Sequence, residues 1–571
     1  MANRYWRTLL CLVIGILLGS VAVSAQSVDI HIGYSSSVLA SRYAPIRVDL
    51  SGLDAEIDGV LRVTQHIGPP DQSPEAVTVD LVEGLLENGT YTGTIPIFDP
   101  LNPIDVAVLT PTGRVLAEQS TNVRLFQRTA RFPVVSGPAI SLGGLEVVVS
   151  PGELPTDWWA FECLDSLWVN GGGVSTSVWE AIARWVFAGG SVVVFTGEDY
   201  YQIDSPAFRR LFPMADLRIE TSAGGTRFLT GDAADKVHVA LSDEASGIPL
   251  LYQTAYGSGT VSVISVRAVD ADAESLADIS ALVPRADWYS LLRFGSEFRG
   301  GMRVSRPIYM IAPSLVVILL LCVGGLRWGI RKRRLTGDAS QAGISMLVVL
   351  VVVIALTVWS GFYANNAKQL VELFQLEFSI QTHTTDGISL GYTGFVSPAT
   401  TRIATIEREQ VSVPIYALAK STSDTSFASS TTPELFEFTI QANEVRDFRH
   451  YGSPRRLVSF GLDRETGRVS LSNSLFYELD VAFILTEGKL YEIGSIPGGD
   501  SSATLGDGVA WGIIGALSPY GDLFEAIIAQ YDLDPGTWLL AVFDGVRQVP
   551  GTQVPTEVRD LELHLVEEDR T

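Results

Sequence analysis

A run of three glycines, Gly171 to Gly173, follows a short apolar stretch and precedes a helix-like segment. Glycines at such a junction let backbone amides approach a phosphate, and two common patterns do this. A P-loop needs a lysine after its last glycine, and none stands here. A dinucleotide fingerprint needs Gly-x-Gly-x-x-Gly, but Thr176 occupies the position of the third glycine. We interpret the run as a turn between a strand and a helix.

A second candidate for ligand chemistry is the acidic stretch "VDADAESLAD", which contains Asp270, Asp272, Glu274 and Asp278. Its Asp-x-Asp-x-Glu spacing is typical of oxygen ligands for calcium. The glycine and the final glutamate that an EF-hand loop requires are missing from their positions. We therefore interpret these residues as the acidic opening of a helix, where they favour the positive end of its dipole.

Other metal chemistry has little support in the sequence. "DLSGL" begins at Asp49 and departs from the Asp-x-Ser-x-Ser metal motif, because Leu53 takes the last position. Cys11 and Cys322 lie in long apolar stretches, so Cys163 alone remains for the folded parts. That excludes a disulfide framework and a cysteine-based zinc site there. We expect no metal and no cofactor.

The elements around the glycines predict an α/β domain. Continuous apolar strands at 145–150, 166–170 and 191–195 alternate with helical segments, which indicates a parallel sheet covered on both faces. The intervening helix is expected to open on a capping box formed by Ser177 and Glu180 and to end at Gly189-Gly190. Its apolar residues fall on a single stripe: Val178, Ala181, Ile182, Trp185 and Val186.

The stretches "LPTDWWAFECLDSLWVN", "VWEAIARWVFAGGSVVVFTG" and "YGSGTVSVISVRAVD" carry a resemblance to a known type of domain. They resemble a family of bacterial membrane proteins with a class I glutamine amidotransferase-like extracytoplasmic domain, over about residues 140–300. The resemblance implies a flavodoxin-like sheet. "GRVSLSNSLFYELDVAFILTEGKLYEIGSIPGGD", from residue 467, is similar to the C-terminal region of the same family.

True amidotransferases place a reactive cysteine on the turn where this chain has Thr196-Gly197. Cys163 lies two elements earlier, and His238, the only histidine between residues 140 and 300, is not in a His-x-Glu pattern. A threonine without a base is inert, so we expect no catalytic residues and treat Thr196 as a vestigial nucleophile position. A candidate ligand crevice at the carboxyl ends of the strands consists of Asn170, Gly171, Gly172, Gly173, Thr196 and Gly197.

The sequence on either side of the α/β domain predicts mainly β-strands. Residues 27–135 are predicted to form a β-sandwich with strands within 44–50, 59–65, 76–82, 90–97, 104–110 and 113–120. Residues 366–571 are predicted to form a second, β-sandwich-like domain with a helix within 508–531. Three histidines are scattered there without a shared motif: His383, His450 and His564.

The topology signals are strong. Residues 1–25 have the basic start, apolar centre and small-residue end of a secretory signal peptide, with an uncleaved anchor as the alternative. Uncharged apolar runs at 307–326 and 344–364 are predicted transmembrane helices. The loop 327–343 between them is basic, which predicts a cytoplasmic position, and its topology determinants are Arg327, Arg331, Lys332, Arg333 and Arg334. Residues 27–306 and 365–571 are then both extracytoplasmic.

These features together predict a multi-pass protein of the bacterial inner membrane. The net charge of −24 argues against nucleic acid as a partner. The expected partners are the lipid bilayer and other membrane or envelope proteins. We predict a non-catalytic accessory or scaffold of an envelope or transport complex. The alternatives are an extracytoplasmic hydrolase and a small-ligand sensor that uses the crevice of the α/β domain.

Overall fold

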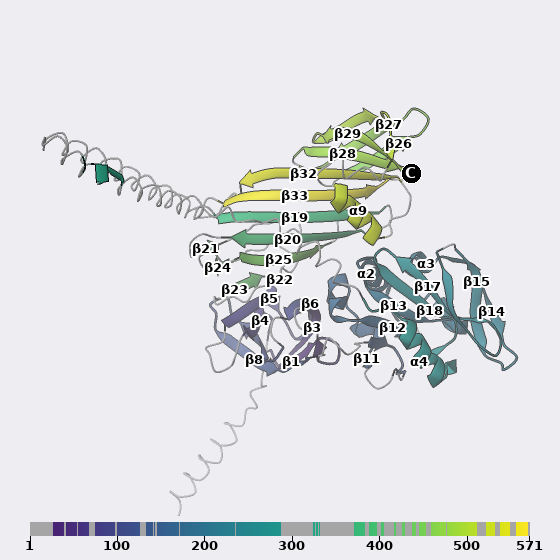
Figure 1. The fold of residues 1–571 in the computed structure, drawn as a ribbon. Coiled ribbons are helices and arrows are strands. Elements are labelled where there is room, and N and C mark those ends of the chain that lie inside the picture. Colours follow the sequence, from purple (N-terminus) through teal and green to yellow (C-terminus); the bar gives the residue numbers. More distant parts are fainter. Residues whose placement is uncertain are drawn as a thin grey trace, which may run out of the picture.

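The computed structural model consists mainly of β-strands arranged in several sheets, with few helices among the residues it describes (Figure 1). A β-rich architecture of several parts was expected from the sequence. The described residues are 27–38, 42–53, 55–67, 75–97, 100–125, 133–140, 142, 146–170, 172–234, 236–286, 324–325, 327–328, 331, 371–382, 387–396, 401–404, 416–417, 425–428, 437–440, 445–452, 458–475, 477–510, 521–531, 537–548 and 556–568.

Strands β1 and β3 to β8 of the N-terminal part pair antiparallel with one another in two sheets, and β2 and β9 form a separate parallel pair. Strands β1, β3 and β6 form the smaller sheet, and β5, β4, β7 and β8 are neighbours in the larger one. Each of the six strands predicted here from alternating sequence lies at the position of an observed strand. The elements are β1 (Ser27–Ile32), β2 (Ser37–Val38), β3 (Arg42–Ser51), β4 (Ile57–Ile67), β5 (Glu75–Leu86), β6 (Gly89–Ile97), β7 (Ile104–Leu109), β8 (Val115–Thr121) and β9 (Arg124–Leu125).

The middle part is built on a seven-stranded sheet in the order β11-β10-β12-β13-β18-β17-β16. The first five strands are parallel, and β17 and β16 continue the sheet antiparallel. Its strands are β10 (Pro133–Ser136), β11 (Val147–Val149), β12 (Ser166–Asn170), β13 (Ser191–Phe195), β16 (His238–Ser242), β17 (Pro249–Tyr256) and β18 (Gly259–Ile264). A separate hairpin pairs β14 (Met214–Thr221) with β15 (Arg227–Ala233).

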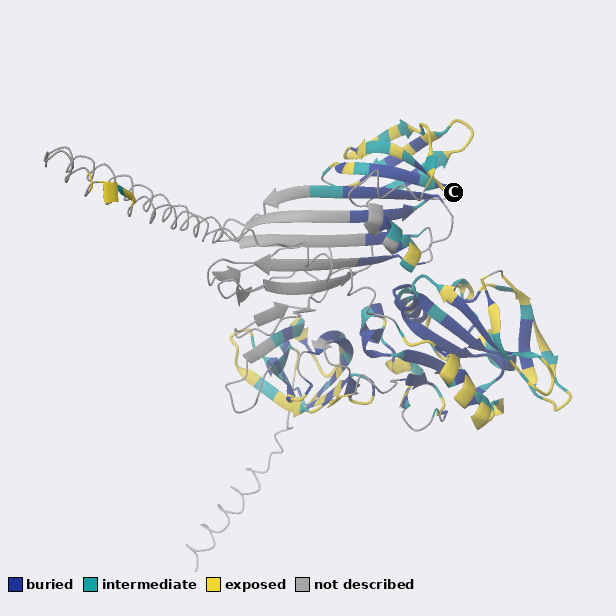
Figure 2. Ribbon diagram, viewed as in Figure 1, coloured by how far each residue is buried: buried dark blue, intermediate teal, exposed yellow. Residues whose placement is uncertain are grey.

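Helices α2 (Thr176–Phe187), α3 (Pro206–Leu211) and α4 (Ala273–Leu282) accompany this sheet, with the 3-10 turns η1 (Pro151–Glu153), η2 (Trp158–Cys163), η3 (Gly197–Gln202) and η4 (Ala268–Asp270). Val192 and Val194 of β13 belong to the same core as α2, whereas Val193 and Phe195 belong to the core under α4. The strand is therefore buried on both faces, as its continuous apolar sequence predicts (Figure 2). β10 was not predicted, and β11 is a short edge strand on which Val148 is 40% exposed.

Helix α2 buries its whole predicted apolar stripe, and it ends before Gly189 and Gly190 as expected. The prediction of its start was wrong by two residues. Ser175, not Ser177, is the N-cap, and its hydroxyl accepts a hydrogen bond from the Val178 amide at 3.3 Å. Glu180 forms no capping box, because its carboxylate pairs with Arg210 at 2.6 Å.

The C-terminal part contains a nine-stranded sheet in the order β22-β25-β20-β19-β33-β32-β28-β29-β31. A three-stranded sheet, β26-β27-β30, shares a hydrophobic core with β28 and β32. The elements are β19 (Val371–Gln381), β20 (Ile388–Val396), β21 (Thr401–Ala404), β22 (Tyr416–Ala417), β23 (Thr425–Ala428), β24 (Glu437–Ile440), β25 (Val445–Gly452), β26 (Val458–Asp463), β27 (Arg468–Asn473), β28 (Leu479–Thr486), β29 (Lys489–Ile496), β30 (Gly499–Thr504), β31 (Val509–Ala510), α9 (Gly521–Gln530), β32 (Trp538–Gln548) and β33 (Thr556–Glu567).

A buried ion pair joins the N-terminal sheets to the middle part. Arg42 of β3 donates to the carboxylate of Glu162 in η2 at 2.7 Å, and the two side chains are 8% and 0% exposed. The backbone amide of Tyr43 donates to the other oxygen of Glu162 at 3.2 Å. Beside this pair, Tyr34 donates its hydroxyl to the carbonyl of Ala160. The orientation of η2 on β3 is therefore set by directional bonds as well as by packing.

The C-terminal part shares a core with the other two. Phe187, at the end of α2, lies against Tyr531 just after α9, with ring centroids 5.6 Å apart. Phe524 and Ile527 of α9 belong to the same cluster of buried residues as the N-terminal strands and α2. In addition, β23 pairs in parallel with β5, so a strand from the C-terminal part extends the larger N-terminal sheet. The three parts thus form one continuous body.

The predicted signal peptide lies outside the described residues, as do the predicted transmembrane helices apart from Gly324 and Gly325. Of the topology determinants, Arg327 and Arg331 are described and exposed, and Lys332, Arg333 and Arg334 are not described. Within the described part of the chain, no helix is long and apolar enough to cross a membrane.

We predict that replacing Glu162 by alanine destabilises the protein by about 3–5 kcal/mol, because it leaves the charge of Arg42 buried without its partner. Urea unfolding of the purified chain would measure the loss. The matched control is Arg209→Ala, which breaks an exposed Arg–Asp pair and should barely move the unfolding midpoint, because water screens such pairs. Equal effects of the two substitutions would contradict the role given to Glu162.

Candidate functional site

The residues of the predicted crevice meet at the carboxyl edge of the parallel sheet. β12 and β13 are neighbours, with Asn170 opposite Phe195, so the loops that follow them leave the sheet side by side. Asn170, Gly172, Gly173, Thr196 and Gly197 therefore lie at one edge, as expected, and Gly171 is outside the described residues. The sequence pattern was enough to predict this placement, because it indicated two parallel strands, and neighbouring parallel strands end at the same edge of a sheet.

Side chains of the protein pack between these loops, where the sequence predicted a crevice. A Cβ placed on Gly172 would lie 2.8 Å from Oε1 and 2.9 Å from Cβ of Gln202, at the end of η3. Gly172 is thus a glycine because a side chain of the neighbouring loop packs on it. The amide of Asn170 is also engaged, since it donates to the carbonyl of Pro138 at 2.6 Å. Both contacts stabilise this edge of the sheet. They engage the surface of Gly172 and the amide of Asn170 within the protein.

Thr196, interpreted from the sequence as a vestigial nucleophile position, is buried and hydrogen-bonded. Its hydroxyl donates to the carbonyl of Ile264 on the neighbouring strand β18 at 2.8 Å, and its amide reaches the same carbonyl at 3.0 Å. A nucleophilic hydroxyl has to donate its proton to a base. Here the proton is held by a backbone carbonyl, which is not a base, so this geometry ties β13 to β18 and does not activate the oxygen.

The turn after Thr196 is locked by a cluster of charges. Glu198 accepts from Arg267 at 2.7 Å and also pairs with Arg227, while Arg267 bonds Asp270 at 2.8 Å. Glu198 and Arg267 lie in the loops that follow β13 and β18, and Arg227 is the first residue of β15. The cluster therefore ties two loops at the sheet edge to the hairpin β14-β15. Sequence reasoning missed it, because the partners are separated by long stretches of chain and share no motif.

Cys163 and His238, the other groups weighed for catalysis, lie away from Thr196. Cys163 is fully buried in η2, and burial, with the nearby charge of Glu162, raises the pKa of its thiol far above the ordinary range. Such a thiol stays protonated and is a poor nucleophile. His238 is exposed at the start of β16, three strands away from β13 in the sheet.

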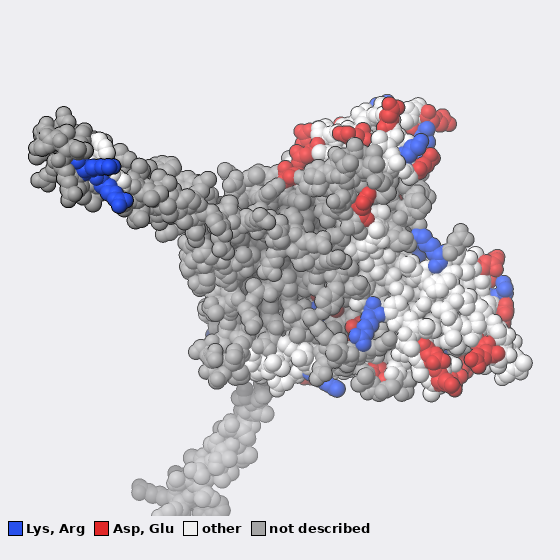
Figure 3. All heavy atoms as spheres, in the orientation of Figure 1, with Lys and Arg blue, Asp and Glu red and all other residues white. Residues whose placement is uncertain are grey.

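The acidic stretch opens a helix, as predicted. Asp272 is the N-cap of α4 and accepts hydrogen bonds from the amide and hydroxyl of Ser275 at 2.7 and 3.0 Å. These bonds lower the pKa of the Asp272 carboxyl. Asp270 is paired with Arg267. Acidic side chains gather over α4 in Figure 3, on the solvent side of the domain.

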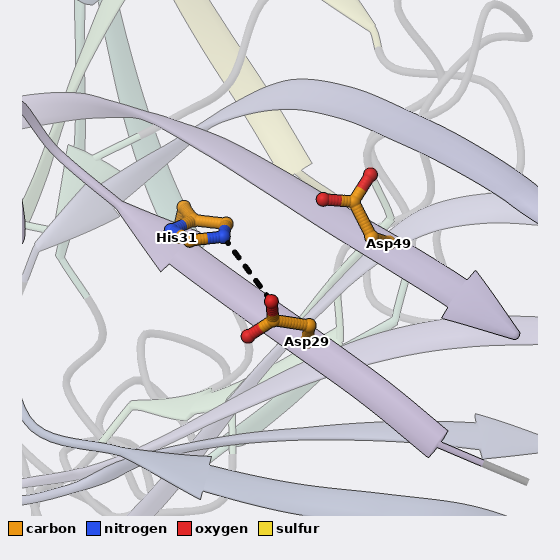
Figure 4. Close-up of side chains that lie close together, drawn as sticks. All are labelled: Asp29, His31 and Asp49. Carbon is orange, nitrogen blue, oxygen red and sulfur yellow. Dashed lines mark ion pairs between the residues drawn. The ribbon is translucent and has the colours of Figure 1, made fainter.

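The structure brings together one group of metal-ligating types that the sequence did not suggest. Asp29, His31 and Asp49 lie on β1 and β3, and their ligand atoms fall within 4.8 Å of one another (Figure 4). Asp49 was considered only within "DLSGL", whose spacing does not fit a metal motif. One sequence feature could have pointed to this group. Polar and apolar residues alternate along β1, and this alternation places Asp29 and His31 together on the exposed face of the strand.

The histidines of the C-terminal part do not form a site among the described side chains. His564 is buried, and its Nδ1 lies 2.9 Å from the hydroxyl of Ser379 on the neighbouring strand. That position fits the structural role expected for it. The side chain of His450 and all of His383 lie outside what the structure describes.

Comparison with known proteins gives no family assignment. No family model matches the chain, and no curated protein matches it. Among solved structures, an exo-β-1,4-mannosidase from Opitutaceae bacterium strain TAV5 is 16% identical over 24% of this chain and 28% of that chain, with a TM-score of 0.19. The Fcho1 Mu homology domain of Danio rerio, with a bound Eps15 peptide, is 11% identical over 35% and 99%, with a TM-score of 0.21.

At these TM-scores neither likeness supports an argument about fold or function. The chain also spans only 28% of the length of the mannosidase. The functional argument therefore depends on the site itself.

We predict that Gly197→Ala destabilises the protein at least twice as much as Gly225→Ala. Both glycines have positive φ, +60° and +86°, so each alanine costs about 1–2 kcal/mol in backbone strain. At Gly197 the new Cβ would also lie 2.8 Å from the amide nitrogen of Arg267, whereas nothing lies within 4 Å at Gly225. Thermal unfolding of the two variants measures the difference, and equal losses would show that the turn does not depend on this close approach.

Proposed function

We propose that the protein is a membrane-anchored, non-catalytic binding or assembly protein of the bacterial envelope. In this proposal the middle part is an amidotransferase-like domain that keeps the scaffold of the enzymes and has lost their chemistry. The observation that carries the proposal concerns Thr196, which stands where the resemblance places the nucleophile of the enzymes. Its hydroxyl is buried and donates a hydrogen bond to the Ile264 carbonyl.

The strand order supports the resemblance to flavodoxin-like folds. Numbered along the chain, the parallel strands β10, β11, β12, β13 and β18 lie in the order 2-1-3-4-5, which is the flavodoxin-like order of doubly wound sheets. Ligands of such sheets bind at the switch point, here between the carboxyl ends of β10 and β12.

That switch point is closely packed in this protein. A Cβ on Gly137, just after β10, would lie 1.9 Å from the carbonyl oxygen of Asn170 at the end of β12. The Asn170 side chain also bridges to Pro138. The two strand ends are thus in direct contact at the switch point, which supports a scaffold over a small-ligand sensor and over a hydrolase.

The shared core supports the proposed topology. Residues 27–286 and 371–568 contribute to one cluster of buried side chains, so both must fold in the same compartment. The chain between them then crosses a membrane an even number of times. Two crossings agree with the two apolar runs and the basic loop in the sequence. We infer that both large parts are extracytoplasmic and that partners bind there.

We predict that Thr196→Ala and Cys163→Ala both keep the cellular phenotype of the wild-type protein, because neither group acts in chemistry. Each variant is first checked for normal folding by circular dichroism. Crosslinking in membranes followed by pull-down should recover the same partners from wild type and both variants. Loss of the phenotype in either folded variant would overturn the non-catalytic assignment.

A labelling experiment tests the topology independently. With the three native cysteines replaced, single cysteines at the exposed positions Glu244 and Lys489 should react with a membrane-impermeant maleimide added to spheroplasts. The matched control, Arg331→Cys in the basic loop, should react only after the membrane is permeabilised. Labelling of all three, or of only one large part, in intact spheroplasts would contradict the proposed arrangement.

A further inference from the structure

We propose that Asp29, His31 and Asp49 bind a divalent transition-metal ion of the zinc type on the outer face of the sheet β1-β3-β6. The register of the strands creates the group. Asp29 lies directly opposite Asp49 in the antiparallel pair, and His31 is two residues along β1 and so on the same face. One imidazole nitrogen and two carboxylates suit zinc-type ions better than calcium or magnesium, which prefer oxygen ligands alone.

The distances agree with this ligand set. Zinc bonds of about 2.1 Å in a tetrahedron keep ligand atoms about 3.4 Å apart. Nε2 of His31 lies 3.4 Å from Oδ2 of Asp29, so two ligands already have that separation. The nitrogen of His31 and the nearest oxygen of Asp49 lie within the 4.8 Å that contains the whole group. Asp29 and His31 are exposed, so rotation of their side chains would bring the remaining ligand atoms to this separation. Figure 4 shows the three side chains on the neighbouring strands β1 and β3.

The charges around the group favour a cation. Two carboxylates directly opposite each other on neighbouring strands destabilise a sheet unless their charge is offset. Arg47 pairs with Asp49 at 3.0 Å, which leaves the local formal charge at −1 when His31 is neutral. A divalent ion would change that charge to +1, with no further carboxylate needed.

Asp49 is also held in place by its neighbours. The hydroxyl of Thr90, on β6, donates to Oδ1 of Asp49, and Arg47 contacts both oxygens. The hydrogen bond from Thr90 orients the carboxylate in the way that is typical around metal ligands. Arg47 competes for the same carboxylate, so the ion would replace its contact with Oδ2. Because Asp29 and His31 are exposed, with side chains 68% and 57% accessible, the ion would keep open positions for water or for a side chain of a partner.

The test uses untagged full-length protein in detergent, titrated with Zn²⁺ against a chromogenic chelator. We expect one ion per chain whose dissociation constant rises at least tenfold in His31→Ala and in Asp29→Asn. The matched control is His238→Ala, which removes an exposed histidine from another sheet and should leave zinc binding unchanged. Ca²⁺ in excess should not displace the zinc.

Folding of the variants is checked by their unfolding temperature without metal, which should equal that of wild type, because both side chains are exposed. Absence of zinc binding to the wild-type chain would overturn the proposal. Equal zinc affinity in wild type and His31→Ala would overturn it too, since the ion would then be bound elsewhere. Neither result would affect the proposed scaffold role, which does not depend on a metal.

Discussion

The carboxylate of Glu162 is fully buried at the contact between the N-terminal sheets and the middle part. Its interactions in the folded protein must offset the free energy of removing this charge from water. A buried charge is stable only when it is paired and hydrogen-bonded. Here Arg42 and the amide of Tyr43 do both, and both belong to β3. Hydrophobic packing alone would allow the two parts to slide on each other, whereas these bonds permit one orientation. The stretch "WWAFEC" is therefore a docking element between parts of the molecule.

Burial also determines the surroundings of Cys163 and Thr196, the two groups of nucleophilic type considered from the sequence. Cys163 follows Glu162 directly and is buried by the docking of η2, so its thiol stays protonated. Thr196 lies at the end of a strand that is buried on both faces, where an unpaired hydroxyl would be costly. It is satisfied by the Ile264 carbonyl. Cys163 thus belongs to the docking of η2 and Thr196 to the pairing of β13 with β18. Both observations support the non-catalytic role that we propose.

The continuous core across the chain has a further consequence for the molecule. α9 and Tyr531 cover the end of α2, although they are separated from it by more than half of the sequence. Local sequence pattern divides the chain into an N-terminal and a C-terminal part. The packing unites them, because neither portion buries this surface alone.

Local pattern determined the elements well. Short strand-like runs predicted β3 to β8 of the N-terminal sheets, although not β1. Continuous apolar runs predicted β12 and β13 to the residue, and a single apolar stripe predicted α2. Even so, Ser175 and Ser177 are equally good caps by composition, and only the path of the chain into the helix decides for Ser175. The residues of the predicted crevice lie at one edge, since adjacent parallel strands end there. The packing of Gln202 on Gly172 was not predicted.

The tertiary structure alone decided the long-range pairings. The Arg42–Glu162 bond, the charge cluster at Glu198 and the opposition of Asp29 to Asp49 each depend on register or on docking. The sequence by itself specifies the period of two or of 3.6 residues that makes a strand or a helix, because that period reflects which neighbours along the chain share a face. It does not specify which distant side chains meet, because those contacts arise only when whole elements pack.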